Sequence, residues 1–194
     1  SKYLRTLRRL RLVDREVPVT ASKKKSKRSR YRVGDEFLRF WFRFVEPNRS
    51  GIEEAPDVVL EERIEPGLPD YVARTFEDVC REAVWAGIRG GEFDPYADVG
   101  RWWYGEDEVD VVGLAPDDDR ILLGECKWTA EPVGHGLAAN LRETAERVRW
   151  GSDDRDERFV LFSKSGFVAG LEDDLDDDWY LYDCGDLDRL LSPE

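Results

Sequence analysis

The order of helical and extended patterns in residues 70–194 constrains the fold of this chain more than any other feature. Apolar residues recur at helical spacing after Asp70 and stop near Gly87, which predicts a capped helix. An order of helix, three strands, helix and strand predicts an α/β domain in which helices flank a mixed sheet. The strands are expected at residues 99–104, 108–114, 120–128, 158–163 and 179–182, and the second helix at residues 137–150.

The first 33 residues have a different pattern, which combines a short helix with two strands. Leu4, Leu7 and Leu10 fall at helical spacing, and arginines fill most of the remaining positions. Residues 13–20 and 31–33 are expected to be strands, separated by a basic loop. A helix followed by a hairpin forms the second half of a winged helix, in which the helix enters the major groove of DNA and the wing lies on the backbone. A disordered basic linker is the alternative interpretation.

Residues 34–69 are expected to join these two parts. Asp35 can cap a helix over residues 36–45, and aromatic side chains surround that helix nearly all round, so it is predicted to be buried. Residues 47–69 are rich in proline, glycine and acidic residues, which indicates a connector. The expected organisation is a partial winged helix at residues 1–33, an aromatic helix and connector at residues 34–69, and the α/β domain at residues 70–194.

Charge is distributed unevenly along the chain. There are 30 lysines and arginines against 43 aspartates and glutamates, a formal charge of -13, yet residues 1–50 alone carry +11. A basic segment can mark contact with nucleic acid, and a solvated charged surface is the equal alternative. From residue 31 onward there are 16 arginines and only two lysines, Lys127 and Lys164. Because dense acidic charge keeps a surface soluble under strong screening, a halophilic source is expected.

Residue usage excludes several classes of site. Three cysteines without a Cys-x-x-Cys pair and a single histidine, His135, provide neither a disulfide framework nor a zinc site. The most apolar run, residues 37–45, is too short to cross a bilayer, so we expect a cytoplasmic protein with no membrane partner. No phosphate-binding Gly-x-x-x-x-Gly-Lys loop is present, so ATP is expected to bind only to a domain upstream of this chain. The missing initiator methionine agrees with that expectation.

Three charged residues on neighbouring strands form the candidate site. Glu125 and Lys127 lie two apart on one strand and share a face, and Asp110 lies near the middle of the preceding strand. If the two strands pair as an antiparallel hairpin, the three side chains converge. Two carboxylates beside an ammonium group can hold Mg²⁺ and hydrolyse a phosphodiester, because the cation activates a water that the lysine orients. A surface ion pair, which contributes about 0–1 kcal/mol, is the alternative.

One acidic residue of the first helix can join this site. With Phe76 at the centre of the buried stripe, Glu77 lies about 100° round the helix and is the acid best placed to reach the sheet. The expected metal ligands are therefore Asp110, Glu125 and Glu77, and the expected catalytic residues are Lys127, Glu125 and Asp110. Retention of Lys127 in a body that otherwise uses arginine supports this assignment, since a compact ammonium differs chemically from a guanidinium.

Six short motifs occur in order between residue 31 and about residue 190. They are YRVGDEFLRFWFRFV at 31–45, FEDVCRE at 76–82, GRWW at 100–103, EVD at 108–110, GECKW at 124–128 and FSKSGF at 162–167. Together they resemble the C-terminal domain of a family of archaeal and bacterial ATPases. The resemblance implies a restriction-endonuclease-like core of the PD-(D/E)XK type, preceded by the C-terminal part of a winged helix. It also implies an AAA+-type ATPase module in cis, upstream of the chain.

The resemblance also implies roles for individual residues and a reaction. The helix acid of the nuclease pattern falls on Glu77, its strand aspartate on Asp110, and its acid-x-lysine on Glu125 and Lys127, while Val109 stands in place of the superfamily's proline. Mg²⁺-dependent hydrolysis of DNA phosphodiesters, as by an endonuclease, is therefore expected. A catalytically silent module that binds nucleic acid or a partner and regulates the ATPase is the alternative, because a fold does not determine an activity.

Five basic residues are expected to contact the phosphate backbone of DNA. Three of them lie on the N-terminal helix, one precedes two tryptophans on the first strand of the domain, and one ends the fourth strand. For the last of these, an exposed turn lysine is a near-equal alternative. The five residues are Arg5, Arg8, Arg9, Arg101 and Lys164.

Overall fold

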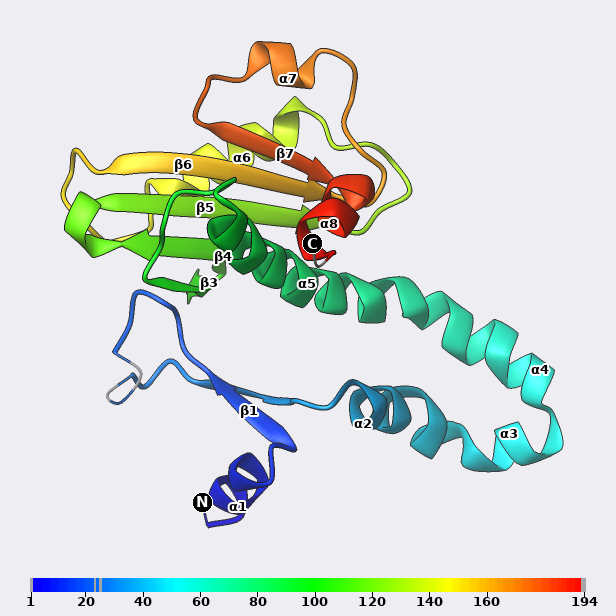
Figure 1. Ribbon diagram of the computed structural model, residues 1–194. Helices are drawn as coiled ribbons and strands as arrows, with labels where there is room; N and C mark the ends of the chain where they lie inside the picture. Colours follow the sequence, from blue (N-terminus) through cyan, green and yellow to red (C-terminus); the bar gives the residue numbers. More distant parts are fainter. Residues whose placement is uncertain (1, 23, 25, 193–194) are drawn as a thin grey trace.

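The computed structural model describes residues 2–22, 24 and 26–192. It contains a five-stranded sheet covered by helices, a helical arm that projects from the sheet, and an N-terminal helix with a two-stranded hairpin (Figure 1). Within the described residues, none of the helices combines the length and the hydrophobicity that crossing a bilayer requires. The α/β class and the mixed sheet flanked by helices, both expected from the sequence, are confirmed.

The strands of the sheet lie in the order β3-β4-β5-β6-β7. β3, β4 and β5 form an antiparallel meander, whereas β5, β6 and β7 run parallel to one another. Each strand agrees with the sequence expectation to within two residues, because apolar runs bounded by turn residues specify strands locally. The strands are β3 Asp98–Tyr104, β4 Asp107–Ala115, β5 Arg120–Lys127, β6 Asp156–Ser163 and β7 Trp179–Asp183.

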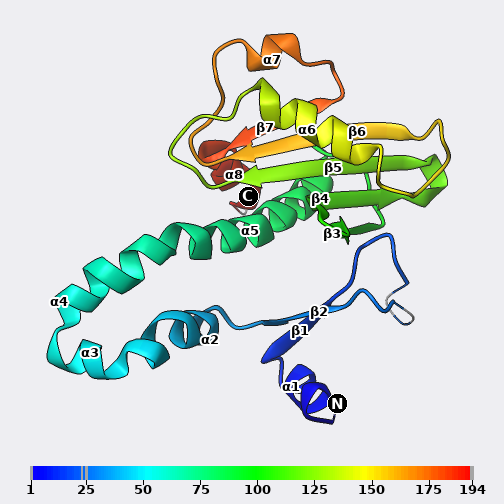
Figure 2. The same ribbon diagram turned by 180° about the vertical axis from the view of Figure 1, so that it is seen from behind.

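Helices cover both faces of this sheet (Figures 1 and 2). The long helix α5 (Leu68–Gly90) and the C-terminal helix α8 (Cys184–Leu191) lie on one face, and α6 (His135–Ala145) lies on the other. α5 ends where Gly91 adopts a left-handed conformation with a φ of 81°. The sequence pattern does not predict α8, although Asp183 forms a capping box that is a local signal for it.

α6 ends five residues before the helix expected at residues 137–150, and one arginine binds carbonyl groups at its last residue and in the segment that follows. The Arg155 guanidinium donates hydrogen bonds to the carbonyl oxygens of Ala145, Val148 and Trp150. These carbonyls thereby have partners outside the helix, and the chain leaves the helix after Ala145. A further short helix, α7 (Leu171–Asp174), lies between β6 and β7.

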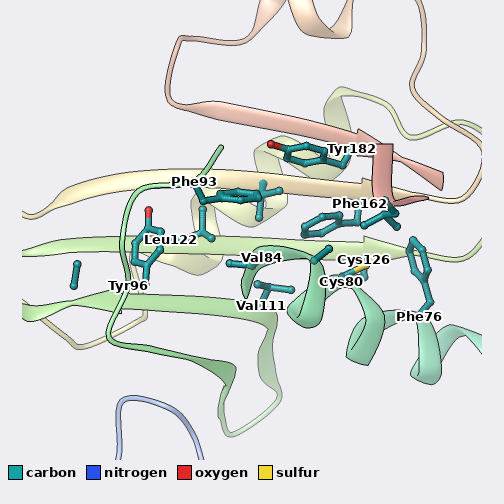
Figure 3. Packing of buried hydrophobic residues seen from close by; sticks show 14 residues of the cluster. Phe76, Cys80, Val84, Phe93, Tyr96, Val111, Leu122, Cys126, Phe162 and Tyr182 are labelled. Carbon is teal, nitrogen blue, oxygen red and sulfur yellow. The ribbon is translucent and has the colours of Figure 1, made fainter. Parts of the chain in front are cut away.

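Apolar side chains form a core on each face of the sheet. The cluster under α6 includes Trp102 and Leu141. Trp102, Trp103 and Cys126 are all buried. The cluster between the sheet and α5, shown in Figure 3, includes Phe76, Cys80, Val84, Phe93, Tyr96, Val111, Leu122, Cys126, Phe162 and Tyr182.

The N-terminal segment has the expected helix and hairpin. α1 (Lys2–Arg9) precedes β1 (Val13–Glu16), which pairs antiparallel with β2 (Arg30–Val33). β1 ends before residue 20, since Pro18 has no backbone N–H to donate. The chain turns toward the sheet instead, and the Val19 N–H donates to the carbonyl oxygen of Arg101 on β3 at 2.8 Å. The basic hairpin, residues 13–33, is therefore docked on the edge strand of the sheet.

The segment between the hairpin and α5 is a helical arm rather than an irregular connector (Figures 1 and 2). Proline is compatible with the first turn of a helix, so the prolines of this segment begin helical turns instead of interrupting them. The arm consists of α2 Glu36–Phe40, a π-helical turn Trp41–Val45, a 3-10 turn Glu46–Asn48, α3 Arg49–Glu54, α4 Pro56–Val59, a π-helical turn Leu60–Ile64 and a 3-10 turn Glu65–Gly67.

The expectation that the aromatic helix is buried all round is wrong. Phe37 and Phe42 are 67% and 58% exposed, whereas Phe44 is buried. The ring of Tyr71 at the start of α5 packs edge-on against Phe40 and Phe44, so the side of the helix that carries these two rings faces α5. The arm projects away from the sheet (Figure 1). Phe37 and Phe42 therefore remain in solvent.

Close packing at Gly124 of β5 generates a prediction about stability. A Cβ atom there would lie 2.5 Å from Cγ1 of Val160 and 3.1 Å from Cβ of Val111. We expect Gly124→Ala to lower the free energy of unfolding by about 1–3 kcal/mol through overpacking. Gly136→Ala on α6 is the control, because a Cβ there meets nothing within 4 Å. Urea unfolding of both variants checks the prediction, and equal stabilities would contradict it.

Candidate functional site

Asp110, Glu125 and Lys127 meet in an open cleft of about 650 Å³ between α5 and the ends of β4 and β5. The antiparallel ladder of these strands ends at the pair Val111 and Gly124, so Asp110 and Glu125 follow next to each other at its end. Lys127 extends from the same face of β5 as Glu125, as predicted from their spacing. Its Nζ lies 3.2 Å from Oε2 of Glu125.

Asp110 is placed by an irregularity of the sheet. Gly100 pairs with Val112 and Trp102 with Val109, so β4 has one extra residue opposite Arg101. Such a bulge reorients a side chain and interrupts backbone pairing. The Asp110 side chain compensates for the interruption, because its Oδ2 accepts a hydrogen bond from the backbone N–H of Cys126 at 3.1 Å. Its own carbonyl oxygen accepts from the Arg81 guanidinium at 2.8 Å.

Glu125 and Lys127 influence each other's protonation. The Glu125 side chain is only 17% exposed, and burial, followed by repulsion from Asp110, raises its pKa to about 7. Burial alone would lower the pKa of Lys127, but attraction to Glu125 outweighs it and the pKa is raised. Lys127 therefore remains a cation at neutral pH.

Glu77 reaches the same cleft from α5, as predicted. Its carboxylate accepts a hydrogen bond from the Arg101 guanidinium. Burial, followed by repulsion from Asp110, raises its pKa to about 7 even though Arg101 acts in the opposite direction. Glu77 is therefore part of the acid cluster, which we define as Glu77, Asp110 and Glu125, but its carboxylate is engaged by an arginine.

Arg101 is the main correction to the predicted site. It was expected to contact phosphate, yet the side chain is only 6% exposed and lies inside the acid cluster. Its Nη2 contacts Glu77 and lies 3.3 Å from Glu108 and 3.6 Å from Asp110. The sequence carries a signal for this position, because a charged residue within an otherwise buried strand requires an oppositely charged partner.

Arg74 is a second residue that the sequence reasoning missed. It lies on α5, one turn before Glu77, and lines the cleft. Its positive charge acts to lower the pKa of Glu77. The spacing of three residues on a helix is the signal that places Arg74 beside Glu77.

The donor chemistry of the cleft fits a divalent cation only in part. Asp110 and Glu125 provide neighbouring hard oxygen ligands with excess negative charge, which suits Mg²⁺ bound through two carboxylates and several waters. Glu77 does not fit as a third ligand while Arg101 binds its carboxylate. In agreement, no group of three histidine, cysteine, aspartate or glutamate side chains in the described part of the chain is arranged to hold a metal ion.

The remaining basic residues of the predicted site lie on two different surfaces. Arg5, Arg8 and Arg9 are exposed on α1. Lys164 follows β6 and is hydrogen-bonded through its backbone N–H to the carbonyl of Lys127, 2.9 Å away. Its Nζ lies 5.0 Å from the centre of the Trp128 ring, which borders the cleft. Lys164 therefore lies beside Trp128, whereas the α1 arginines belong to the N-terminal segment.

The cleft residues named above as the acid cluster lie in the part of the chain that a known protein family matches. A model of the protein family described as archaeal and bacterial proteins of unknown function matches residues 41–144, which include the whole acid cluster, Arg101 and Lys127. An uncharacterized protein of Methanocaldococcus jannaschii is 33% identical over 129 residues, which are 66% of this chain and 29% of that protein. The chain therefore spans less than a third of this relative. No solved structure matches the chain.

The raised pKa of Glu125 predicts a pH-dependent stability. The unfolded chain releases this proton near the ordinary value of 4.5, whereas the folded protein retains it until about pH 7. The group's contribution is therefore favourable below pH 4.5 and is lost as pH rises to 7. In metal-free buffer, Glu125→Gln should be more stable than wild type by about 1–3 kcal/mol at pH 8 and equal to it at pH 4.5.

Urea unfolding at the two pH values measures this difference. Glu131→Gln is the control, because Glu131 is an exposed loop residue with the same charge. Wild type and Glu125→Gln with the same stability at pH 8 would contradict the prediction.

Proposed function

We propose that this chain, which belongs to the DUF234 family of archaeal and bacterial proteins, hydrolyses phosphodiester bonds of DNA with Mg²⁺. The observation that carries the proposal is the convergence of Asp110, Glu125 and Lys127 at the end of the β4–β5 ladder in one open cleft. Two adjacent carboxylates with a charged lysine form the donor set that metal-dependent phosphodiester hydrolysis requires.

The topology supports a PD-(D/E)XK nuclease core. α5, the antiparallel meander β3-β4-β5, α6 and the parallel strand β6 follow the helix, three strands, helix and strand order. β7 and α8 extend this unit at one edge. Glu77 comes from α5, Asp110 from β4 and Glu125 from β5. In the nuclease pattern that the sequence resembles, the metal-binding acids also come from one helix and two neighbouring strands.

Each residue of the cleft has a separate task in the proposed reaction. Asp110 and Glu125 would hold the cation, which when bound polarises a phosphoryl oxygen and lowers the pKa of a bound water. Lys127 keeps its proton because Glu125 attracts it, so Nζ can donate hydrogen bonds to the phosphate or orient the water. Arg74, which lines the cleft, and Lys164, beside Trp128, would bind the neighbouring phosphates.

The N-terminal segment supports a role in DNA binding. α1 exposes its arginines, and together with the basic hairpin it has the element order of the second half of a winged helix. The chain spans 29% of the Methanocaldococcus relative, so that relative has room for further domains. We propose an upstream ATPase domain in cis as the partner, with ATP bound only there.

A specific observation favours a second function, a catalytically silent regulatory module. Arg101 already neutralises part of the acid cluster, and the residues that line the cleft include seven acidic and three basic side chains. Such a surface repels phosphate unless a cation is present. Under this alternative the fold binds nucleic acid or a partner and does not catalyse a reaction.

Nicking of supercoiled plasmid with Mg²⁺ or Mn²⁺ at high salt separates the two functions. Asp110→Asn and Lys127→Ala should lower the nicking rate at least about 100-fold, because each removes a group that acts on the reacting phosphate. Asp117→Asn is the control, since Asp117 is exposed in a turn away from the cleft. A wild type that binds plasmid but nicks it no faster than both variants would refute hydrolysis and support the silent module.

The salt dependence of DNA binding tests the N-terminal segment. Replacing Arg5, Arg8 and Arg9 with alanine should weaken binding and make the slope of log affinity against log salt less steep by about 0.9 for each phosphate contact removed. Fluorescence anisotropy of a labelled duplex at KCl concentrations from about 0.1 to 1 M measures this slope. Arg63→Ala, an exposed position on the arm, should leave the slope unchanged. An unchanged slope in the triple variant would contradict the assignment.

A further inference from the structure

The contacts of Arg101 are poorly distributed for an arginine that only stabilises the fold. One terminal nitrogen, Nη2, forms ion pairs with Glu77, Glu108 and Asp110. Within the described part of the chain, its Nε and Nη1 are buried and have no hydrogen-bond partner. Buried donors without acceptors cost stability, and a guanidinium usually places its nitrogens on carboxylates in pairs. The position of Arg101 therefore requires an explanation other than stability.

Asp110 is the residue at which Arg101 and a divalent cation would compete. Its Oδ1 lies 3.6 Å from Nη2 of Arg101, and its carboxylate is also the neighbour of Glu125 across the strand pair. A cation held by Asp110 and Glu125 has the same sign of charge as the guanidinium. The guanidinium and the cation would both lie next to Asp110, where water screens charges poorly, and would repel each other. Each therefore weakens the binding of the other to Asp110.

Glu108 provides Arg101 with a second acceptor, nearer to solvent. Nη2 of Arg101 lies 3.3 Å from Oε1 of Glu108, whose side chain is 35% exposed. The same carboxylate is bound by Arg30 of the basic hairpin, with Nη1 3.0 Å from each oxygen. Arg30 therefore limits how much of the Glu108 charge is available to Arg101.

The basic hairpin meets β3 at Arg101 through several contacts. The Val19 N–H donates to the Arg101 carbonyl, and the Arg30 guanidinium lies 4.5 Å from the centre of the Trp103 ring. The backbone of Arg101 is thus bound to the hairpin while its side chain is bound to the acid cluster. Arg101 therefore connects the basic hairpin to the acid cluster.

We propose that Arg101 is the internal counter-ion of the acid cluster and sets the affinity of the site for a divalent cation by competing for Asp110. It is a positioning residue, because it acts through Asp110 and Glu77 and not on a substrate. The inference rests on the proposed function in one respect, since it takes Asp110 and Glu125 as the cation-binding pair. When the Arg101 side chain binds Glu108 instead of Asp110, Asp110 and Glu125 become available to the cation.

Binding of Mn²⁺ to the full chain tests the proposal without any activity measurement. The free Mn²⁺ signal in electron paramagnetic resonance gives the affinity at fixed pH and ionic strength. The double variant Glu77→Gln with Arg101→Met removes one charge of each sign, so the net charge of the cluster is unchanged. Its affinity should exceed that of wild type about tenfold, because a competing charge-assisted contact to Asp110 is gone.

Two single variants identify the cause of that change. Glu77→Gln alone should bind Mn²⁺ more weakly than wild type, since Arg101 then binds Asp110 more strongly. Asp110→Asn should abolish binding. If Glu77 were itself a ligand, adding Arg101→Met to Glu77→Gln would not restore affinity, and this result would overturn the proposal.

The outcomes separate the inference from the proposed function. Binding that depends on Asp110 but is no tighter in the double variant than in wild type overturns the role of Arg101 and leaves the cation site intact. Absence of any Asp110-dependent binding in all proteins overturns both. Tighter binding in the double variant together with loss in Asp110→Asn supports both.

A surface variant keeps the proposal testable if the double variant does not fold, which circular dichroism shows. Arg30→Ala frees the Glu108 carboxylate to attract Arg101, so Mn²⁺ affinity should rise about threefold. Lys27→Ala is the matched control, because it removes the same charge from an exposed position of the same hairpin. Equal affinities of the Arg30→Ala and Lys27→Ala proteins would overturn the proposal.

Discussion

The balance of charge inside the cleft is the constraint on which the rest of the site depends. Glu77, Asp110 and Glu125 approach one another where water screens them poorly, and burial together with mutual repulsion raises the pKa of Glu77 and of Glu125. Arg101 and Lys127 supply the opposite charge. Removal of one partner from a buried ion pair leaves an uncompensated charge. Loss of Arg101 or Lys127 alone would therefore destabilise the folded protein.

The acid cluster lies where the β4–β5 ladder ends. Both faces are covered by apolar side chains under α5 and α6, so polar side chains collect where strand pairing stops. The β4–β5 ladder ends at Val111 and Gly124, beside the bulge in β4, and the Asp110 carboxylate there accepts from the N–H of Cys126. α5 contributes to the core and to the cleft, because Phe76 packs in the core and the adjacent Glu77 borders the cleft.

Sequence reasoning succeeds where the interactions are short in range. The strands and the shared face of Glu125 and Lys127 follow from a period of two residues, and the neighbouring position of Asp110 follows from a hairpin. It fails at residues 47–69, where proline and glycine indicate a connector although all four prolines lie in the first turn of a helix. It also fails for Phe37, since its exposure depends on how far the arm projects from the sheet.

The sequence by itself determined the order of the strands of the mixed sheet with the helices α5 and α6, and the residue types that could carry the chemistry, because periodicity and turn residues act over a few positions. Only the tertiary structure decided what Arg101 binds. Its three acidic partners come from α5 and from β4, where Asp110 lies in the bulge and Glu108 precedes it, and an ion pair depends on distances that the chain sets only after it has folded. An arginine predicted to bind an external phosphate is for that reason found binding internal carboxylates.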